Sequence, residues 1–343
     1  MKKLRNTLYV TTPDAYLSLD GENIVLSVGK EERGRKPLHL LESIVIFGYL
    51  GASPALLGKC SEYGITVTFL TPSGKFLSRC VGKTYGNVIV RRTQYRIADD
   101  KEQSLHIAAN ILSAKMTNSA SVLRRVLSDH RERIGADKIE NIAAEIKYNA
   151  VRAYSAESAE SLRGLEGESA NRYFSIFDEM ILSQKEFFRY DGRNRRPPLD
   201  PVNAMLSFGY ALMTSLCTSA LETSGLDPYV GFFHTERPGR CSLALDLLEE
   251  FRAPFVDRFV LTMINKKVVS DSSFCQKENG AILLTDAARA EFLIQWQKKK
   301  QDEIIHPYLK EKVQWGMIPF IQAMLLAKYI RGDIDDYPPF LWK

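Results

Sequence analysis

The stretch that decides the fold class is residues 104–127, which read SLHIAANILSAKMTNSASVLRRVL. Apolar residues recur there at intervals of three and four, the period of one face of an α-helix. The same period returns in IENIAAEIKYNAVRAY (139–154). Later helices are expected near residues 161–174, 202–224, 243–252, 287–300 and 319–330. The chain beyond about residue 97 is therefore predicted to be all-helical.

Residues before about 90 have the pattern of a β domain. Short apolar runs rich in β-branched residues flank turn residues in two pairs, which predicts two hairpins: AYLSLD (15–20) with IVLSVG (24–29), and ITVTFLT (65–71) with FLSRCVG (76–82). SIVIFGYL (43–50) adds another strand. Ser53 as N-cap and Pro54 at the first helical position predict a short helix that Gly64 ends.

Together these patterns predict an α+β multidomain chain, with a small N-terminal mainly-β domain followed by a larger all-α domain. We place the β domain at residues 1–90, a basic linker at 91–96 and the helical domain at 97–343. A length of 343 residues also suits two domains.

Composition sets limits on the class of protein. The net charge of +5 permits a nucleic-acid partner without requiring one. Five scattered cysteines and a start without a secretory signal predict reduced thiols and a cytoplasmic location. Residues 201–221 carry no charge and are long enough to cross a bilayer, but their many hydroxyl and amide side chains favour a buried helix. We expect no membrane association.

Several common catalytic motifs are missing from the sequence. Neither G-x-x-x-x-G-K-[ST] nor a G-x-G-x-x-G after a strand occurs, which disfavours nucleotide-driven chemistry. G-x-S-x-G and H-E-x-x-H are also missing, which removes the commonest serine-hydrolase and zinc-protease signatures.

The residues with most chemical interest follow His234. A Pro-Gly loop leads to a helix starting near Ser242, on which Asp246 and Glu249 point to nearly the same side; Pro254 should end this helix. Two acids and an imidazole suit Mg²⁺ or Mn²⁺.

Glu166 could complete this set from another helix, within GLEG (164–167). Each of the two glycines costs about 1 kcal/mol inside a helix, relative to alanine. They would keep bulk away from a carboxylate that meets a metal and a phosphate.

A structural interpretation fits the same residues. His234 could be a buried histidine, Asp246 and Glu249 could pair with Arg240 or Arg252, and Glu166 could be a surface acid beside Arg163. Spacing alone leaves both interpretations open, because the residues need a fold to bring them together.

Four segments, in this order, resemble the CRISPR-associated adaptation integrases, the first of the two adaptation proteins, here called Cas-one: GLEG (164–167), DPVNAMLSFGYAL (200–212), GLDPYVGFFHT (225–235) and RPGRCSLALDLLEEFR (237–252). The resemblance covers essentially the whole chain. The N-terminal part and LKEKVQWGMIPF (309–320) look like the subtype I-C branch.

The resemblance implies a metal-dependent DNA endonuclease and integrase that acts in antiviral defence. In this family a 3′-hydroxyl of a captured DNA fragment attacks a phosphodiester at the edge of a CRISPR repeat. The family's metal-binding and catalytic triad maps to Glu166, His234 and Glu249, with Mg²⁺ or Mn²⁺ as the metal. Many members have Asp at the third position, so Asp246 is an alternative ligand.

The resemblance also implies the partners: duplex DNA, a second copy of the chain, and the second adaptation protein, Cas-two, with the β domain serving dimerisation or partner docking. Local charge nominates the following DNA contacts: Arg91, Arg92, Arg172, Arg193, Arg196, Arg237, Arg240 and Arg252. Two other functions are compatible with these residues: a non-catalytic DNA-binding assembly protein, or a metal-dependent phosphodiesterase acting on RNA or branched DNA.

Overall fold

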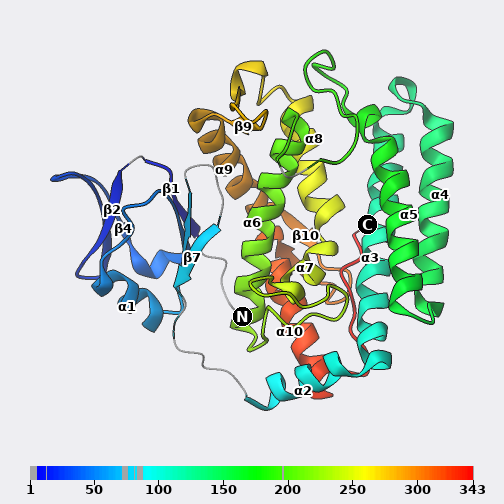
Figure 1. Ribbon diagram of the computed structural model, residues 1–343, viewed down its shortest axis with the longest axis horizontal. Helices are drawn as coiled ribbons and strands as arrows, with labels where there is room; N and C mark the ends of the chain where they lie inside the picture. The colour runs from blue at the N-terminus through cyan, green and yellow to red at the C-terminus, as the bar shows by residue number, and fades with distance from the viewer. Residues whose placement is uncertain are drawn as a thin grey trace. The chain divides into compact units, whose positions relative to one another are not determined.

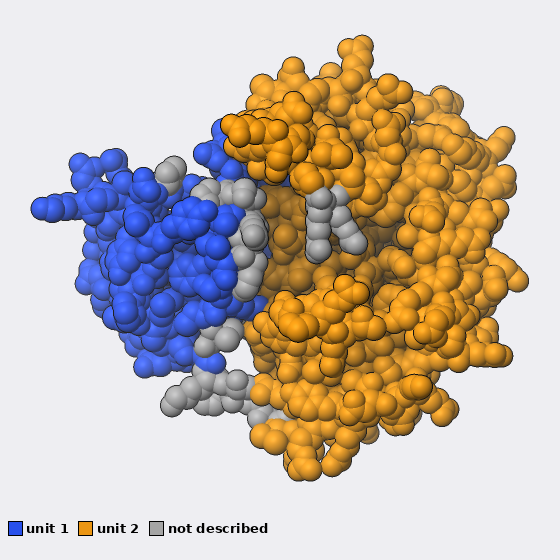
Figure 2. All heavy atoms as spheres, in the orientation of Figure 1, with its two compact units in different colours: residues 1–85, 286–302, 314–316 blue, residues 86–285, 303–313, 317–343 orange. Residues whose placement is uncertain are grey.

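The structure is a computed structural model and describes residues 6–12, 14–71, 76–80, 82, 88–194 and 197–342. Contacts divide the chain into two units, coloured separately in Figure 2. Unit 1 holds residues 1–85, 286–302 and 314–316, and unit 2 holds the remainder. A β-rich N-terminal region is followed by a helical C-terminal region, which confirms the predicted fold class.

The described residues of unit 1 form two sheets. In the first, β1 (Asn6–Val10), β5 (Leu41–Phe47) and β6 (Thr66–Leu70) run parallel, and β7 (Phe76–Cys80) pairs antiparallel with β6. The second is the antiparallel meander of β2 (Ala15–Asp20), β3 (Asn23–Val28) and β4 (Glu31–Pro37). Both predicted hairpins form, although turn residues 72–75 lie outside the described residues. Helix α9 (Asp286–Gln301) also belongs to unit 1.

Helix α1 (Pro54–Glu62) starts as the sequence predicts, because the Ser53 side chain accepts a hydrogen bond from the backbone N–H of Leu56. The core of the unit is apolar, and Leu17, Ile44 and Val67 are fully buried. Strand β4 was not predicted. Its sequence, EERGRKP, is charged and exposed, as suits an edge strand that must not attract a further strand.

Unit 2 is built from helices (Figure 1): α2 (Val88–Asp99), α3 (Lys101–His130), α4 (Ala136–Arg152), α5 (Ala159–Ser175), α6 (Pro201–Thr223), α7 (Ser242–Glu249), α8 (Arg258–Asn265) and α10 (Ile318–Arg331). Short strand pairs also occur: β8 (Phe274–Gln276) with β9 (Ile282–Leu284), and β10 (Glu303–Ile305) with β11 (Lys312–Gln314).

Short 3₁₀ turns occur in the described residues of both units: Leu38–Leu40, Arg131–Arg133, Ala153–Ser155, Phe177–Met180, Asp271–Ser273 and Trp315–Met317.

Helix α3 is the longest element of unit 2, at 30 residues. It runs beside α4 and α5 (Figure 1) and also contacts α7. The predicted period of residues 104–127 is therefore the trace of a helix that is covered on several sides. Helix α6 has the length and composition of a membrane span, but 61% of its most apolar window is buried inside the protein.

Two local expectations were wrong. Residues 91–96 do not form a linker, because they lie inside α2. Pro254 does not end the helical path after α7, because it lies in a π-helical turn (Arg252–Asp257) that leads into α8. The backbone N–H of Val256 bonds to the carbonyl of Phe251, five residues earlier, so the chain passes the proline without stopping.

The C-terminal segment is held by buried hydrogen bonds. The carboxylate of Glu250 accepts from the Tyr337 hydroxyl, the Gln322 amide and the backbone N–H of Phe340. Asn118 on α3 accepts from the backbone N–H of Trp342. This aromatic tail is therefore an internal part of unit 2, and it anchors the residue that follows Glu249.

Replacing Tyr337 with Phe is expected to lower the free energy of unfolding by about 1–3 kcal/mol, because the buried Glu250 carboxylate loses a donor and keeps its burial. Urea denaturation followed by circular dichroism measures the change. Tyr308→Phe is the matched control, since that ring is half exposed. Equal stability of the two variants would contradict a supporting role for this bond.

Candidate active site

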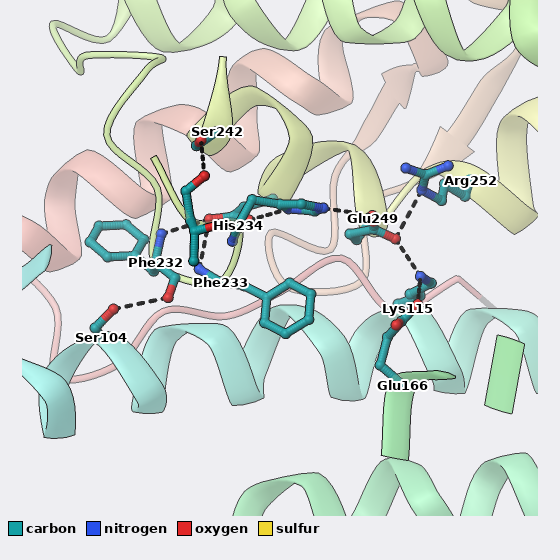
Figure 3. A network of polar contacts seen from close by, with 11 residues as sticks. Ser104, Lys115, Glu166, Phe232, Phe233, His234, Ser242, Glu249 and Arg252 are labelled. Atoms are coloured by element: carbon teal, nitrogen blue, oxygen red, sulfur yellow. Dashed lines mark hydrogen bonds and ion pairs between the residues drawn. The ribbon is translucent and has the colours of Figure 1, made fainter. Parts of the chain in front are cut away.

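The loop that carries His234 is fixed from three helices. The Gln94 side chain on α2 donates to the carbonyls of Asp227 and Val230. The Ser104 hydroxyl on α3 donates to the carbonyl of Phe232 (Figure 3). The Ser242 hydroxyl at the start of α7 donates to the carbonyl of Thr235. A loop held at so many backbone groups presents its side chains in a defined direction.

Asp246 lies on α7, and the His234 loop folds around its side chain. Its fully buried carboxylate accepts hydrogen bonds from the backbone N–H groups of Phe232, Phe233 and His234, at 2.7, 3.0 and 2.9 Å. A Cβ at Gly231 would lie 2.8 Å from an Asp246 oxygen, so only glycine permits this close approach.

The same carboxylate orients the imidazole. Oδ1 of Asp246 lies 2.6 Å from Nδ1 of His234. Because the carboxylate can only accept there, Nδ1 donates its N–H to Asp246, and Nε2 is the ring nitrogen left to face the rest of the site. Nε2 faces Glu249 and lies 3.9 Å from its Oε1 (Figure 3).

Glu166 and Glu249 meet at one lysine. Glu166 comes from α5 and Glu249 from the last turn of α7, and Lys115 of α3 lies between them (Figure 3). The Lys115 ammonium contacts the Glu166 carboxylate and lies 2.6 Å from Oε2 of Glu249. Arg252 approaches the same oxygen with its Nε at 2.9 Å.

These contacts set the charges of the site. Burial alone would raise the pKa of Glu249, but Arg252, Lys115 and His234 outweigh it and hold the pKa at about 2. Burial alone would lower the pKa of Lys115, but Glu249 and Glu166 raise it above its ordinary value. The carboxylate of Glu249 and the ammonium of Lys115 are therefore both charged at neutral pH.

A cavity of about 260 Å³ opens beside these residues. Its lining includes Lys115, Glu166, His234, Glu249, Arg193 and Arg252. Tyr210 and Asp257 also line the cavity; the buried Tyr210 hydroxyl donates to Asp257, and burial raises the pKa of Asp257 to about 6. Positive and negative groups thus share one small chamber within unit 2.

Arg193 is held by one face of α6. Its guanidinium donates to Asn203 and, at 3.1 Å, to the Ser207 hydroxyl, and it lies 5.4 Å from the Tyr210 ring. Residues 203, 207 and 210 follow each other at helical spacing, which explains why DPVNAMLSFGYAL carries polar residues at these positions. Within the described residues, no carboxylate forms an ion pair with Arg193, although it lines the cavity.

The other nominated arginines have varied surroundings. Arg172 pairs with Glu145 and Glu168, so its charge is already compensated. The Nε of Arg91 donates to the carbonyl of Gly225. Arg92 and Arg237 are exposed, Arg240 is half-buried, and Arg196 lies outside the described residues. Of the nominated arginines that the structure describes, only Arg193 and Arg252 line the cavity.

The three sequence-predicted ligands come together, but they do not yet surround a point. No group of three His, Cys, Asp or Glu side chains in the described part of the chain is arranged to hold a metal as it stands. Their chemistry nevertheless fits a divalent ion, because two carboxylates share one cation, Lys115, and Nε2 of His234 faces one of them, Glu249. Since both acids contact one nitrogen, their oxygens lie well within the roughly 8 Å that one metal could join.

The glycines beside Glu166 do not pack against any other described part of the chain. Within the described residues, a Cβ at Gly164 or Gly167 would meet no atom within 4 Å other than its own helix backbone and chain neighbours. The structural interpretation is correct in one respect, because Glu249 does pair with Arg252. Arg163 contacts Glu160 rather than Glu166.

Comparison with known proteins identifies the family. A family model described as CRISPR associated protein Cas1 matches residues 8–298. The chain belongs to the Cas1 family. A curated relative from Chlorobaculum tepidum, named CRISPR-associated endonuclease Cas1 1, is 48% identical over 343 residues and the match covers both chains completely. A relative from Rhodospirillum rubrum, named CRISPR-associated endonuclease Cas1 2, is 45% identical over 350 residues, again over both whole chains.

Solved structures share this Cas1 fold. A casposase bound to integration product matches with a TM-score of 0.85 and 23% identity, covering 99% of this chain and 95% of that one. A Cas1 protein from Thermotoga maritima matches with a TM-score of 0.80 and 22% identity, covering 95% and 97%. These similarities show the fold.

Sequence reasoning missed one central residue of this Cas1 site, Lys115. It is the only charged residue between His106 and Arg124, inside an otherwise apolar and small-residue stretch of α3. A lone lysine in an apolar stretch of a helix needs an acidic partner if it is buried, and this pattern in the sequence could have indicated Lys115. Asp257 was also missed, since nothing in its local pattern marks it.

Proposed function

We propose that this chain is a metal-dependent DNA endonuclease and integrase of CRISPR adaptation, with Glu166, His234 and Glu249 as metal ligands and catalytic residues. The observation that carries the proposal is the meeting of these three side chains beside one cavity, from α5, a loop and α7. Curated relatives over the whole chain carry the name endonuclease, which supports phosphodiester chemistry.

The residues divide the work in a definite way. Glu166, Glu249 and Nε2 of His234 would hold Mg²⁺ or Mn²⁺, and Asp246 would orient the imidazole rather than bind the ion, because its two oxygens already accept four hydrogen bonds. A bound divalent ion supplies polarisation of a phosphoryl oxygen and a lower pKa for the attacking hydroxyl.

Arg193 and Arg252 would position the phosphate. Both guanidiniums line the cavity, and both lie over the Tyr210 ring, at 5.4 and 4.6 Å. Arg193 keeps its charge without a carboxylate partner among the described residues, as an anion-binding residue requires. In the joining reaction, a 3′-hydroxyl forms the new ester bond to phosphorus while the old 3′-oxygen leaves.

The partners follow from the same proposal. We infer duplex DNA, a second copy of this chain and the second adaptation protein as partners, in the cytoplasm. A solved structure of similar fold is titled Cas6-RT-Cas1–Cas2 complex, with a TM-score of 0.82, and the casposase structure is titled as bound to an integration product. The subtype I-C assignment stays a prediction from the N-terminal part and residues 309–320.

The test of this function is strand joining in vitro. Purified protein, with and without Cas-two, is given short duplex DNA and a plasmid carrying a CRISPR repeat. Joined product is expected with Mn²⁺ or Mg²⁺, loss with EDTA, and return when the metal is added back. DNA binding without any joining would favour the non-catalytic assembly protein, and cleavage limited to RNA or branched DNA would favour the phosphodiesterase.

Replacing Arg193 with Gln is expected to lower the rate of strand joining by about 10- to 100-fold, since a charge-assisted contact to phosphate is worth roughly 1.5–3 kcal/mol. The reduction should appear on every substrate sequence, because phosphate contacts carry no sequence information. Arg331→Gln is the matched control, as Arg331 pairs with Asp333 at the far end of α10. An equal loss in both variants would contradict the assignment.

A further inference from the structure

Lys115 holds the place between the two carboxylates that the proposed function gives to the metal. In the part of the chain that the structure describes, it is the only cation in contact with both Glu166 and Glu249. Arg252 also contacts Glu249, but its guanidinium makes a second interaction, with the Tyr210 ring, whose centroid lies 4.6 Å away. One ammonium therefore bridges the pair of acids that a divalent ion would bridge, and it balances one of their two negative charges.

The contact of Lys115 with Glu249 is a buried ion pair. Oε2 of Glu249 is buried, and the Lys115 ammonium and the Arg252 Nε lie 2.6 and 2.9 Å from it. The same arrangement leaves the three ligands unable to surround one point. A divalent ion would need that space, and it would be repelled by an ammonium left in it.

The Lys115 side chain also has space to move away from the two carboxylates. Its side chain lines the cavity of about 260 Å³, alongside the small residues Ser119, Ser169 and Ala170. A lysine has four flexible methylene groups and can swing its charge aside, whereas an arginine fork fixed on two partners cannot do so as easily.

We propose that Lys115 is an internal substitute for the metal. It bridges Glu166 and Glu249 while no metal is bound, keeps the mutually repelling acids together, and is displaced into the cavity when the metal binds. The site is thus preassembled by a charge of the protein's own, and Lys115 and the metal exclude each other. This inference rests on the proposed function of Glu166 and Glu249.

The test is a thermal-stability cycle on the full chain, using Mn²⁺ alone as the probe. Lys115→Met is expected to lower Tm without metal by roughly 5 °C or more, because two acids lose their shared cation. At saturating Mn²⁺ the gap from wild type should close to within about 1 °C. Mn²⁺ should also bind the variant at least about tenfold more tightly, as measured by electron paramagnetic resonance of free Mn²⁺.

Lys147→Met is the control, since the Lys147 ammonium donates to the Thr117 hydroxyl and forms no ion pair with an acid within the described residues. A gap that persists at saturating Mn²⁺, or weaker binding by Lys115→Met, would overturn the inference and make Lys115 a permanent structural partner. If Lys115→Met does not fold without metal, refolding with Mn²⁺ should recover it, and failure there would also overturn the inference. Mn²⁺ that stabilises wild type and Glu166→Gln equally would instead overturn the proposed metal site itself.

Discussion

Strand joining and DNA cleavage by Glu166→Gln are expected to fall by about a thousandfold or more at saturating Mn²⁺. The substitution keeps the side-chain shape but removes the charge that contacts Lys115 and would bind the metal. A metal ion contributes several kcal/mol of transition-state stabilisation, and each 1.4 kcal/mol is a factor of ten in rate. The assay follows joined and nicked plasmid on denaturing gels.

Glu168→Gln is the matched control for this variant. Glu168 lies two residues further along α5 and pairs with Arg172 on the surface. It should join strands at close to the wild-type rate. Both variants should be folded and should bind DNA. Full activity in Glu166→Gln, with the variant folded and bound to DNA, would rule out Glu166 as a metal ligand.

Asp246→Asn is expected to cost about 3 kcal/mol in the free energy of unfolding and about 10- to 100-fold in Mn²⁺ affinity. The carboxylate accepts three backbone N–H groups and the His234 ring. An amide in either orientation turns its own N–H toward one of those donors, and a buried donor is left unpaired. The imidazole then loses its fixed direction, which weakens a metal site from outside its ligand set.

Asp227→Asn is the control for the loop. Asp227 accepts from the Tyr229 backbone and the Tyr95 hydroxyl at a less buried position, and the hydroxyl can turn to donate or accept. Its loss of stability should stay below about 1 kcal/mol. If Asp246→Asn keeps full stability but abolishes Mn²⁺ binding, while Glu249→Gln binds Mn²⁺ normally, then Asp246 is the third ligand and the assignment of Glu249 is wrong.

The elements that sequence predicted well are those whose period is set by burial. The hairpin of residues 15–29 alternates between two environments, and α3 repeats at helical spacing because several neighbours cover it. Strand β4 escaped prediction because EERGRKP has no apolar face. The linker at 91–96 was wrong because a basic run in a helix looks, in sequence, like a basic run in a connection.

The residues of the site also fall into those that the sequence predicted and those that it did not. Glu166, His234 and Glu249 were nominated by resemblance, and the fold brings them to one cavity. Spacing could not distinguish Asp246 from Glu249, since both lie on one face of α7; the difference lies in the loop that folds over Asp246. Lys115 is 51 residues from Glu166 in sequence, and the contact between them exists only through the packing of α3 on α5.

The central claim is that Glu166, His234 and Glu249 bind one divalent ion. Its most direct test is a crystal structure with Mn²⁺, with the ion located by its anomalous scattering. We predict one strong peak at about 2.0–2.4 Å from a carboxylate oxygen of Glu166, from Nε2 of His234 and from a carboxylate oxygen of Glu249. A peak that contacts Asp246 instead of Glu249, or no peak near these residues at saturating Mn²⁺, would contradict the account.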